Sequence, residues 1–439
     1  MNKKLQNLSV HFIGVGGAGM SVLCKYLLSK NFLVSGSDKV ESQTVRELIS
    51  IGLTFYQGHN HNAVDNADVI IYTSAISEEN PELVRARYLK KTILKRSELL
   101  NLILKTHKSS IGISGSHGKT TASFMLNEIL LTAGVTNNSF IGGEYKVNDY
   151  DDSKVALAEV CEFDRNIDLI SVDYPVCLNI DSDHLDTYGT LDNLDNAFKS
   201  FLNKGKISFI NFDDNRLCLL KHKNAITFSI NAESDYKAVE ILEENGYYSF
   251  KVSESCVVSN RIYLGVLGYH NIYNALSAIA VARKVFNIEY GCIINALCSF
   301  TGAKRRFERV GNFKGKTIFC DYAHHPTEIK ATLVASKKVF NNDYLVVFQP
   351  HTYSRTKNLF EEFKLALQGE NLVIYKEYPS REIYDYLGSA KRLADGVNSP
   401  LVEDFDSLIE IIDNTKKKNI LVLGAGDIYD LVIDAIKNG

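Results

Sequence analysis

A glycine-rich loop between an apolar run and a helical run constrains the fold of this chain more than any other feature. The loop reads GISGSHGKTT at residues 112–121, and the helical pattern after it continues to near Gly134. Small residues at the start of a helix let backbone N–H groups approach phosphate oxygens, and the helix N-terminus adds partial positive charge. The segment therefore predicts an α/β domain with a phosphate-binding loop at one edge of a parallel sheet.

The side chains of this loop predict a site for ATP and Mg²⁺. Lys119 can reach the β- and γ-phosphates, and Thr120 can ligate the metal. The strict pattern G-x-x-x-x-G-K-[ST] fails at one position, because Ile113 stands in place of its first glycine. A chance Gly-Lys-Thr sequence is the alternative, and the strand–loop–helix context disfavours it. The predicted ATP-binding residues of the loop are Gly115, Ser116, His117, Gly118, Lys119, Thr120 and Thr121.

Apolar runs alternate with helical patterns along the 439 residues, which favours several domains over one. We expect an α/β fold with an N-terminal Rossmann-like domain, a central P-loop mononucleotide-binding sheet and a C-terminal Rossmann-like domain, at residues 1–107, 108–309 and 310–439. Between residues 236 and 266, alternating polar and apolar residues predict antiparallel strands. Buried strands are predicted at residues 8–15, 32–35, 68–74, 111–114, 317–320, 344–348, 372–375 and 420–423, and two further strands end at Glu159 and Ile180.

Acidic residues follow two of the predicted central strands. Glu159 and Glu162 lie at the end of one strand, and Asp181, Asp183, His184 and Asp186 follow the other. Ligands of open α/β sheets bind at the carboxyl ends of strands, so these side chains are expected near the phosphate loop. Oxygen ligands suit Mg²⁺. For Glu159, Asp183 and Asp186, a solvated or helix-capping role is the favoured interpretation.

A second glycine loop, GVGGAGMS, opens the chain after its first apolar run. It fits G-x-G-x-x-G at residues 14–19, and Asp38 follows about 20 residues after the loop. By itself this pattern is a weak sign of an NAD-dependent oxidoreductase.

Histidines dominate two motifs of the third block, DYAHHPTEI and QPHTYSRT. His324, His325, His351 and Arg355 can hold a small zwitterion, with Arg355 pairing with its carboxylate. Zinc binding by the histidines is the alternative, disfavoured because no third ligand stands at a familiar spacing.

Two further motifs border the third block. In GYHNIYN, Asn271 and Asn274 share one helical face and suit adenine, although helix capping by Asn271 is an alternative. In GAKRRF, Arg305 and Arg306 form a cationic pair that a solvated surface would also explain.

These motifs together resemble the Mur ligases, which add amino acids to the peptidoglycan precursor. The loop G-S-H-G-K-T-T, the histidine motifs and the segments GHN at residues 58–60 and SAISEENPE at residues 74–82 are similar to that family over nearly the whole chain. Cys161 and Phe163 depart from the family's usual Asp and Ser. Several members carry a carbamylated lysine, and Lys199 lies at a suitable distance, but we favour an exposed helix lysine there.

The resemblance assigns roles to individual residues, which we carry forward as predictions. Lys119, Glu162, His184 and Arg306 are expected to be catalytic, with Thr120, Glu162 and His184 holding the metal. ATP is expected to meet Asn271, Asn274 and Asp321 besides the loop, and the incoming amino acid to meet His324, His351 and Arg355. The predicted UDP-sugar site comprises Gly14, Gly16, Gly17, Gly19, Met20, Ser21, Asp38 and Ser74.

The function implied is ATP-dependent ligation of L-alanine to the lactyl carboxylate of UDP-N-acetylmuramate. The alternatives are a recycling ligase that attaches a tripeptide to the same nucleotide-sugar, and an NAD-dependent dehydrogenase fused to an ATPase. A net charge of −3 without a basic patch disfavours nucleic acid as a partner, and no apolar run approaches the ~18 residues of a membrane span. We expect a cytoplasmic monomer or weak dimer. The eight cysteines form no C-x-x-C pair and predict neither a zinc site nor a disulfide framework.

Overall fold

The computed structural model describes residues 8–142, 150–181, 185–220, 224–380 and 382–438. The chain folds into two compact units. The first unit comprises the residues up to 240 with 251–262 and 273–297, and the second comprises 241–250, 263–272 and 298–439. None of the described helices has the length and apolar character required to cross a membrane.

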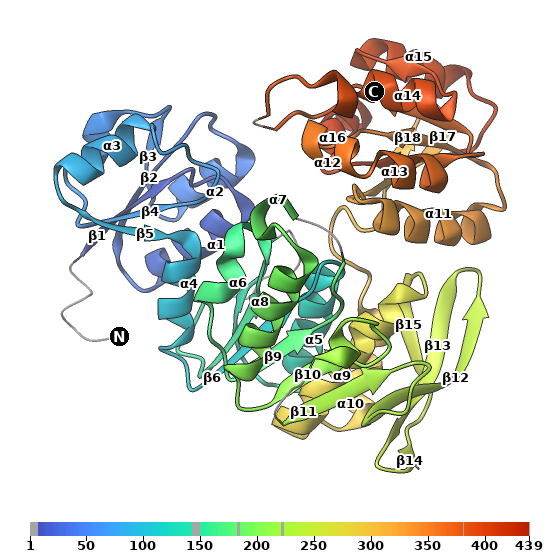
Figure 1. Ribbon diagram of the computed structural model, residues 1–439, viewed down its shortest axis with the longest axis horizontal. Helices are drawn as coiled ribbons and strands as arrows, with labels where there is room; N and C mark the ends of the chain where they lie inside the picture. The colour runs from blue at the N-terminus through green and yellow to red at the C-terminus, as the bar shows by residue number, and fades with distance from the viewer. Residues whose placement is uncertain (1–7, 143–149, 182–184, 221–223, 381, 439) are drawn as a thin grey trace. The chain divides into compact units, whose positions relative to one another are not determined.

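The N-terminal sheet of the first unit is parallel and has the strand order β3-β2-β1-β4-β5 (Figure 1). This doubly wound order confirms the predicted α/β fold of the first block, although β3 and β5 were not predicted. Its elements are β1 (Ser9–Ile13), α1 (Ala18–Ser29), β2 (Leu33–Asp38), α2 (Gln43–Ser50), β3 (Thr54–Gln57), η1 (His61–Val64), β4 (Val69–Tyr72), α3 (Pro81–Tyr88), β5 (Thr92–Lys95) and α4 (Arg96–Leu104).

Both faces of this sheet are buried because its strands alternate between two cores. Phe12 and Ile71 pack in one core with α1 and α4, whereas Ile13 and Ile70 pack in the other with α3. Because the pleat sends successive side chains to opposite faces, the strands appear in the sequence as unbroken apolar runs.

The central sheet has the order β14-β13-β12-β11-β10-β9-β6-β8-β7, with β15 pairing with β13. β13 and β14 are antiparallel, as the alternation predicted, but β12 joins β11 in parallel. The strands are β6 (Ser109–Ser114), β7 (Asn138–Phe140), β8 (Val155–Glu159), β9 (Tyr174–Cys177), β10 (Ser208–Asn211), β11 (Ala225–Ser229), β12 (Tyr236–Glu244), β13 (Tyr247–Glu254), β14 (Val257–Val258) and β15 (Ile262–Leu267).

Two helices of the central sheet, the one after the phosphate loop and the one that carries Asn271 and Asn274, were predicted, and the others were not. The helices are α5 (Lys119–Thr132), η2 (Phe163–Arg165), α6 (Asn166–Leu169), α7 (Leu185–Tyr188), α8 (Leu191–Asn203), η3 (Leu217–Leu219), α9 (His270–Phe286) and α10 (Tyr290–Ser299). Gly134 ends α5 with φ +74°, and its N–H donates to the carbonyl oxygen of Leu131 at 2.9 Å. The helix end expected near Gly134 is thus confirmed, and glycine adopts the left-handed conformation that often ends a helix.

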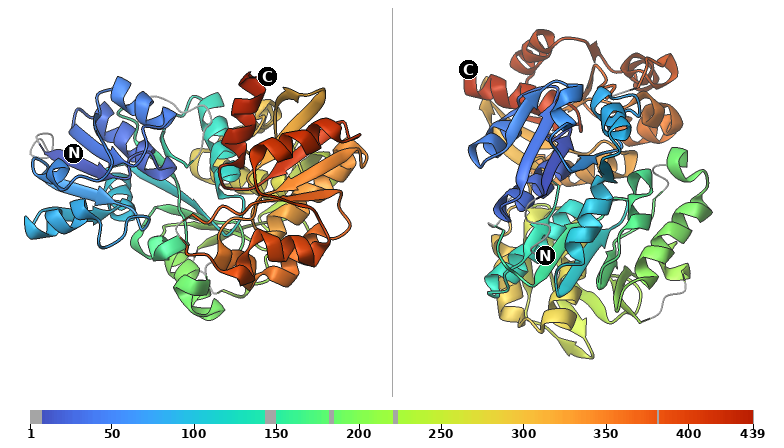
Figure 2. Two further views of the ribbon diagram at one scale, coloured as in Figure 1. Left: turned by 90° about the horizontal axis from the view of Figure 1, so that it is seen from above. Right: turned by 90° about the vertical axis from the view of Figure 1, so that its left-hand side faces the viewer.

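The C-terminal sheet has the order β16-β17-β21-β18-β19-β20, and helices cover both of its faces (Figure 2). Its edge strand β16 is antiparallel to β17. The prediction of a wholly parallel sheet in this block is therefore wrong for its edge. The elements are β16 (Glu308–Phe313), β17 (Lys316–Asp321), α11 (Pro326–Phe340), β18 (Tyr344–Phe348), α12 (Tyr353–Asn358), α13 (Phe360–Leu367), β19 (Leu372–Tyr375), η4 (Tyr386–Gly388), α14 (Ala390–Val397), β20 (Leu401–Val402), α15 (Phe405–Asn414), β21 (Asn419–Leu423) and α16 (Ile428–Asn438).

Within the first unit, one apolar core joins the N-terminal sheet to the central sheet. Tyr26 of α1 packs edge-on against Phe140 of β7 at 5.1 Å between ring centroids, and the Tyr150 hydroxyl donates to the Val22 carbonyl at 3.3 Å. The side chain of Asn101 accepts a hydrogen bond from the Ser171 N–H at 3.0 Å. The two sheets therefore share buried surface, which the domain boundary expected at residue 107 did not predict.

Candidate active site

The phosphate loop has the backbone geometry that its glycines predicted. The loop connects β6 to α5, and Gly115 and Gly118 adopt φ angles of +139° and +86°. A Cβ on Gly115 would lie 3.1 Å from the backbone nitrogen of Asn179. Only glycine combines the positive φ with this close approach, so the loop is fixed against the segment that follows β9.

Lys119 lies folded against the loop at the start of α5. Its Nζ donates to the carbonyl oxygens of Gly115 at 2.6 Å and Ser116 at 3.0 Å, and lies 3.0 Å from Glu162 Oε2. Burial disfavours the ammonium ion, but the charge of Glu162 outweighs burial and raises the pKa of Lys119. Lys119 is thus a fully charged group held beside the loop, as phosphate binding requires.

Three oxygen-bearing side chains around Lys119 fit the preferences of Mg²⁺. Thr120 Oγ1 donates to Glu159 Oε2 at 3.0 Å, and the carboxylate of Glu162 lies beside Lys119. Hydroxyl and carboxylate oxygens are suitable ligands for a hard cation. Glu159 is therefore closer to the predicted metal position than its sequence interpretation as a solvated acid suggested.

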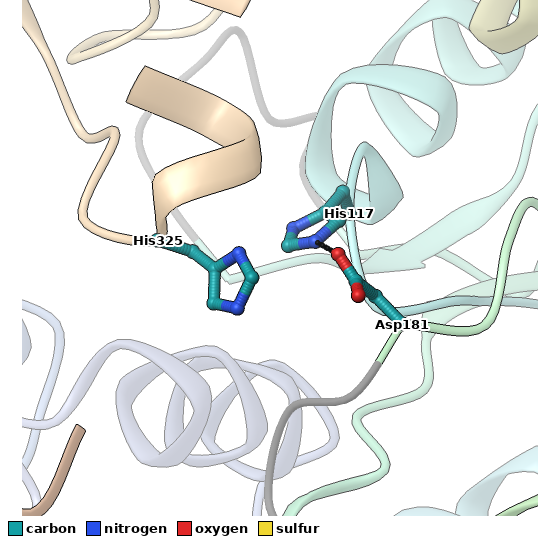
Figure 3. Close-up of side chains that lie close together, drawn as sticks. All are labelled: His117, Asp181 and His325. Atoms are coloured by element: carbon teal, nitrogen blue, oxygen red, sulfur yellow. Dashed lines mark hydrogen bonds and ion pairs between the residues drawn. The ribbon is translucent and has the colours of Figure 1, made fainter. Parts of the chain in front are cut away.

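His184 and Asp183 lie outside the described residues. Asp181 is described: its Oδ2 lies 2.9 Å from His117 Nε2 (Figure 3). The N–H of His117 donates to Asn179 Oδ1 at 2.8 Å, and the N–H of Asp181 donates to Ser116 Oγ at 2.8 Å. These contacts tie the loop to the strand end after β9, and the adjacency of both segments to strand termini was the sequence signal for them.

Cys161 introduces an uncharged group where the family usually has an aspartate. Burial, followed by the charge of Glu162, raises the pKa of the Cys161 thiol to about 11. The thiol stays protonated at neutral pH, so Lys119 faces two nearby carboxylates, Glu159 and Glu162, rather than three.

The two asparagines predicted to meet adenine lie at the start of α9. Asn274 is buried, and its Oδ1 lies where a side chain on Gly118 would stand, 2.4 Å from an ideal Cβ. Asn271 is also buried, and its Nδ2 donates to the Leu267 carbonyl at 2.7 Å. Asn274 is thus adjacent to the phosphate loop, and adenine binding by either residue stays a prediction.

The glycine loop of the first sheet is braced by Asp38. The N–H of Gly16 donates to Asp38 Oδ2 at 2.8 Å, and Gly14 has a φ of +81°. Met20 and Ser21 are buried in the first turns of α1, where the Ser21 hydroxyl donates to the Ala18 carbonyl at 3.0 Å. If Met20 and Ser21 bind the nucleotide as predicted, they would do so through backbone atoms and not through their side chains.

The remaining predicted nucleotide-sugar residues surround the same loop. Gly17 precedes α1, and Gly19 lies in its first turn. Ser74 is exposed after β4, where Thr73 and Ile76 flank Gly14. The carboxyl ends of β1, β2 and β4 thus surround the loop, as the topology of a parallel sheet requires.

Beside Asp38, the segments GHN and NPE meet through a buried carboxylate. Glu82 is fully buried and accepts hydrogen bonds from the Ser37 hydroxyl at 2.6 Å and the Asn60 N–H at 3.3 Å. Its Oε2 lies 3.1 Å from His59 Nδ1. Although burial opposes ionisation, the nearby His11 ring and the hydrogen bond from Ser37 hold the pKa of Glu82 below its usual value. Glu82 therefore links the loop after β3 to the end of β2.

The third block brings its predicted amino-acid-binding residues together. The rings of His324 and His351 lie 5.7 Å apart at 73°, and Arg355 Nη1 lies 3.4 Å from His351 Nδ1. Burial, and then the electrostatic effect of the neighbouring His324 and Arg355, lower the pKa of His351 to about 3. His351 is thus neutral at physiological pH beside a cationic Arg355.

Neighbouring residues of this cluster have structural roles. His325 is buried and caps α11, where its Nδ1 accepts from the Thr327 N–H at 3.3 Å. His324 Nδ1 lies 3.0 Å from the Tyr322 carbonyl oxygen. Asp321 accepts from the N–H groups of Phe307 and Ala323, both at 2.7 Å, and burial raises its pKa to about 6.

The two arginines of GAKRRF are separated by their partners. Arg305 pairs with Asp430 at 2.8 Å and stacks over Tyr429. Arg306 lies 5.3 Å from the centre of the Tyr322 ring and 3.9 Å from Glu328. Arg306 therefore lies beside the histidine motif, and its predicted catalytic role stays untested.

Comparison with known proteins places the chain in a class. Residues 9–108 match the Mur ligase family, catalytic domain; residues 113–282 match the Mur ligase middle domain; and residues 305–427 match the Mur ligase, glutamate ligase domain. Together with the three sheets and the phosphate loop, these matches show that the chain belongs to the Mur ligase family.

Within that class the similarity is to one kind of enzyme. The chain is 39% identical over 441 residues to the UDP-N-acetylmuramate–L-alanine ligase of Clostridium acetobutylicum and 38% identical over 440 residues to that of Clostridium tetani, each covering 96% of both chains. The crystal structure of UDP-N-acetylmuramate-alanine ligase from Thermotoga maritima matches with a TM-score of 0.83 at 26% identity, covering 98% of this chain and 99% of that one.

Proposed function

We propose that this chain is an ATP-dependent ligase that joins L-alanine to the lactyl carboxylate of UDP-N-acetylmuramate, releasing ADP and phosphate during peptidoglycan precursor synthesis. The observation that carries the proposal is the identity of 38–39% over 96% of the chain to ligases of that name. The charged Lys119 at the phosphate loop and the paired histidine motifs support it independently.

The reaction requires activation of a poor electrophile. The γ-phosphoryl group of ATP passes to the lactyl carboxylate oxygen, and the alanine amine attacks the acyl carbon, forming the amide and expelling phosphate. Both early reactants are anionic, so charge neutralisation is the main catalytic requirement. Lys119 supplies one fixed positive charge, and Mg²⁺ held by Thr120, Glu162 and His184, with Glu159 beside Thr120, would supply more.

The third block provides complementary groups for the amino acid. Arg355 is a planar cation suited to an α-carboxylate. His351, kept neutral, accepts from Arg355 at Nδ1 and so presents an N–H at Nε2. Both groups donate hydrogen bonds, so together they suit the α-carboxylate of an amino acid.

The recycling ligase and the dehydrogenase are the competing functions. A tripeptide-adding enzyme would use the same nucleotide-sugar, so only the amine substrate distinguishes it. A dehydrogenase would use the first glycine loop for NAD, but it leaves the phosphate loop and the histidine cluster unexplained.

Phosphate release provides the test. With UDP-N-acetylmuramate and ATP, we expect release to depend on L-alanine and not on the tripeptide L-alanyl-γ-D-glutamyl-meso-diaminopimelate. The Lys119→Ala variant controls for contaminating ATPases and should lower kcat by roughly 10²–10³. Release that requires the tripeptide, or hydride transfer to NAD without phosphate release, would reject the proposal.

A further inference from the structure

Thr352, between His351 and α12, has a backbone conformation that residues with a side chain rarely adopt. Its φ is +68° and its ψ is 141°. A β-branched residue is strained at such a positive φ, because its Cβ crowds the neighbouring backbone. Strain of this kind persists only where the surrounding structure enforces it. Neighbouring residues must therefore hold the turn at Thr352 in place.

Backbone atoms of Tyr378 hold this turn from both sides. The Thr352 N–H donates to the Tyr378 carbonyl oxygen at 2.9 Å, and the Tyr378 N–H donates to the Pro350 carbonyl oxygen at 2.8 Å. His351 and Tyr378 are thereby paired in parallel. This bridge extends the pairing of β18 with β19 beyond the carboxyl ends of the two strands.

The side chain of Tyr378 covers the His351 ring. The two rings are stacked, with centroids 5.6 Å apart and an angle of 20° between their planes, a favourable arrangement for an aromatic pair. His324 contacts the same imidazole edge-on at 5.7 Å, and Arg355 Nη1 lies 3.4 Å from its Nδ1. Among the described residues, these three are the titratable or charged groups that face the ring. Tyr378 thus restrains the rotation of the imidazole and covers one of its faces.

Gly426, in the loop after β21, supports Tyr378 from another side. An ideal Cβ on Gly426 would stand 2.6 Å from Tyr378 Cβ and would overlap Gln349 Oε1. Gln349 is buried, and its Nε2 donates to Asp427 Oδ1 at 2.8 Å. The absence of a side chain at position 426 therefore lets the loop backbone lie directly against Tyr378.

We propose that Tyr378 is a positioning residue for the amino-acid substrate, because it holds the strained turn at Thr352 and so keeps His351 and Arg355 beside each other. The inference rests on the proposed function. His351 precedes the turn and Arg355 lies in the first helical turn after it, so a relaxed Thr352 would change the direction of one relative to the other. Tyr378 acts through His351 and not by contact with the amino acid. The groups that bind the amino acid are thus arranged before it arrives, which lowers the entropy lost on binding.

Steady-state phosphate release with L-alanine as the varied substrate tests this assignment. Without its ring, residue 378 is no longer packed against His351 and Gly426, so Tyr378→Ala should raise the KM for L-alanine roughly three- to tenfold. The KM for ATP should stay within about twofold. Tyr378→Phe keeps the ring and should behave as wild type. Tyr378→Leu keeps apolar volume beside Gly426 and should change the KM in the same direction as alanine, so it replaces Tyr378→Ala if that variant does not fold.

A matched control comes from the same helix. Lys357 of α12 is exposed, and its Nζ pairs with Asp385 Oδ2 at 3.0 Å. Lys357→Ala removes a contact between α12 and the segment that follows Tyr378, but it leaves the bridge to His351 intact. Its KM for L-alanine should stay within about twofold of wild type.

Titration of the His351 ring gives a readout that does not depend on activity. Burial lowers the pKa of His351 to about 3, so its NMR signal, assigned by comparison with His351→Gln, should not titrate between pH 5 and pH 8 in wild type and Tyr378→Phe. Tyr378→Ala exposes one face of the ring, so the midpoint should move above pH 5. A protonated Nδ1 cannot accept from Arg355. The KM for L-alanine should therefore rise more between pH 7 and pH 5 in Tyr378→Ala than in Tyr378→Phe.

The role of the strained backbone is tested by a second substitution. Glycine adopts a positive φ without strain, so Thr352→Gly should keep the turn and leave the KM for L-alanine within about twofold. In this background the turn depends less on its support by residue 378. Tyr378→Ala should therefore raise the KM for L-alanine by a smaller factor in Thr352→Gly than in wild type.

The outcomes separate this assignment from the proposed function. If Tyr378→Ala keeps the KM for L-alanine within about twofold and leaves His351 untitrated above pH 5, Tyr378 is not a positioning residue, and the proposed function stands. The same conclusion follows if Tyr378→Ala has equal effects in the wild-type and Thr352→Gly backgrounds. If the wild-type protein releases no phosphate in response to L-alanine, the proposed function is rejected, while the His351 titration still decides whether Tyr378 holds the ring.

Discussion

Glu159 and Glu162 illustrate how two acids three residues apart acquire different partners. Glu162 is buried against the ammonium group of Lys119, whereas Glu159 accepts the hydroxyl proton of Thr120. The sequence favoured a metal role for Glu162 through family resemblance and a solvated role for Glu159. The structure brings both carboxylates beside the phosphate loop.

The Mg²⁺ requirement should distinguish these two acids. Glu162→Gln removes an anionic ligand with little change of shape, so we expect the half-saturating Mg²⁺ concentration to rise on the order of tenfold. Glu159→Gln keeps an amide oxygen that can accept from Thr120, so its shift should be smaller. Mg²⁺ titrations of phosphate release measure both. Identical curves for Glu162→Gln and wild type would remove Glu162 from the metal site.

His351 makes stability depend on pH in a defined direction. Its native pKa is lowered to about 3 by burial and by the neighbouring His324 and Arg355, whereas an unfolded histidine has a pKa of ~6.5. Between these values the unfolded state binds the extra proton, so this contribution to stability is lost as pH falls from about 6.5 towards 3. Between pH 7 and pH 5, wild type should lose about 2 kcal/mol more than His351→Gln.

Denaturant unfolding of the two proteins at both pH values measures this difference. His61→Gln, at an exposed position of η1, is the matched control and should follow wild type. If wild type and His351→Gln lose stability in parallel, His351 is not held neutral in the folded protein.

At the scale of elements, the phosphate loop depends on contact with α9 as well as on its own glycines. Gly118 has a φ of +86°, and a Cβ there would stand 2.4 Å from Asn274 Oδ1. The loop and the helix are separated by about 150 residues in sequence. Their contact links the phosphate-binding loop to the start of α9. In the sequence, only Asn271 and Asn274 pointed to this part of the chain.

Gly118→Ala should therefore be costly for two reasons, strain at positive φ and steric overlap with Asn274. We expect a loss of about 2–3 kcal/mol in the free energy of unfolding and a raised KM for ATP. Gly134→Ala has a similar φ but open space around the Cβ, so it should lose only about 1 kcal/mol. Asn274→Ala introduced into Gly118→Ala should recover part of the difference. Equal losses at the two glycines would show that the contact with Asn274 has no energetic effect.

At the scale of the whole molecule, one face of the first sheet shares its core with the central sheet. Tyr26, Leu100 and Leu104 belong to one buried cluster with Phe140 and Ile167 of the central sheet. The domain boundary predicted at residue 107 thus marks the connection between two sheets. Side chains from both sides of it pack in the same core. The proposed domain limits at residues 107 and 309 remain predictions about the chain.

An isolated fragment of residues 1–107 should consequently be much less stable than the same residues in the full chain. Removing the central sheet exposes apolar side chains of α1 and α4, at ~25 cal/mol per Å² of apolar surface. We expect a lower Tm for the 1–107 fragment than for the corresponding transition of the full-length protein, with dye binding to the exposed apolar face. Scanning calorimetry compares the two. A fragment that unfolds at the full-length temperature would show that the shared core adds no stability.

The sequence by itself determined the parallel α/β architecture and the position of the phosphate loop. Strands buried on both faces must be continuously apolar, as at residues 344–348, and a glycine loop before a helix has few structural alternatives. These are local constraints, so local patterns were enough. The residue pattern singled out Glu162, His351 and Arg355, and the family resemblance assigned Glu162 to the metal; the structure places these residues beside the partners described above.

The tertiary structure alone decided which distant groups meet. Glu159 turned toward Thr120, β16 joined its sheet in the antiparallel direction, and Arg96 reached Gly19 from a strand two positions away. Hydrogen-bond partners and strand direction depend on contacts between residues far apart in the chain. No periodic pattern in the sequence shows which of these residues will meet. The fold likewise decides which arginines of the first sheet pair with carboxylates. It brings Asp65 to Arg85 and Glu78 to Arg87.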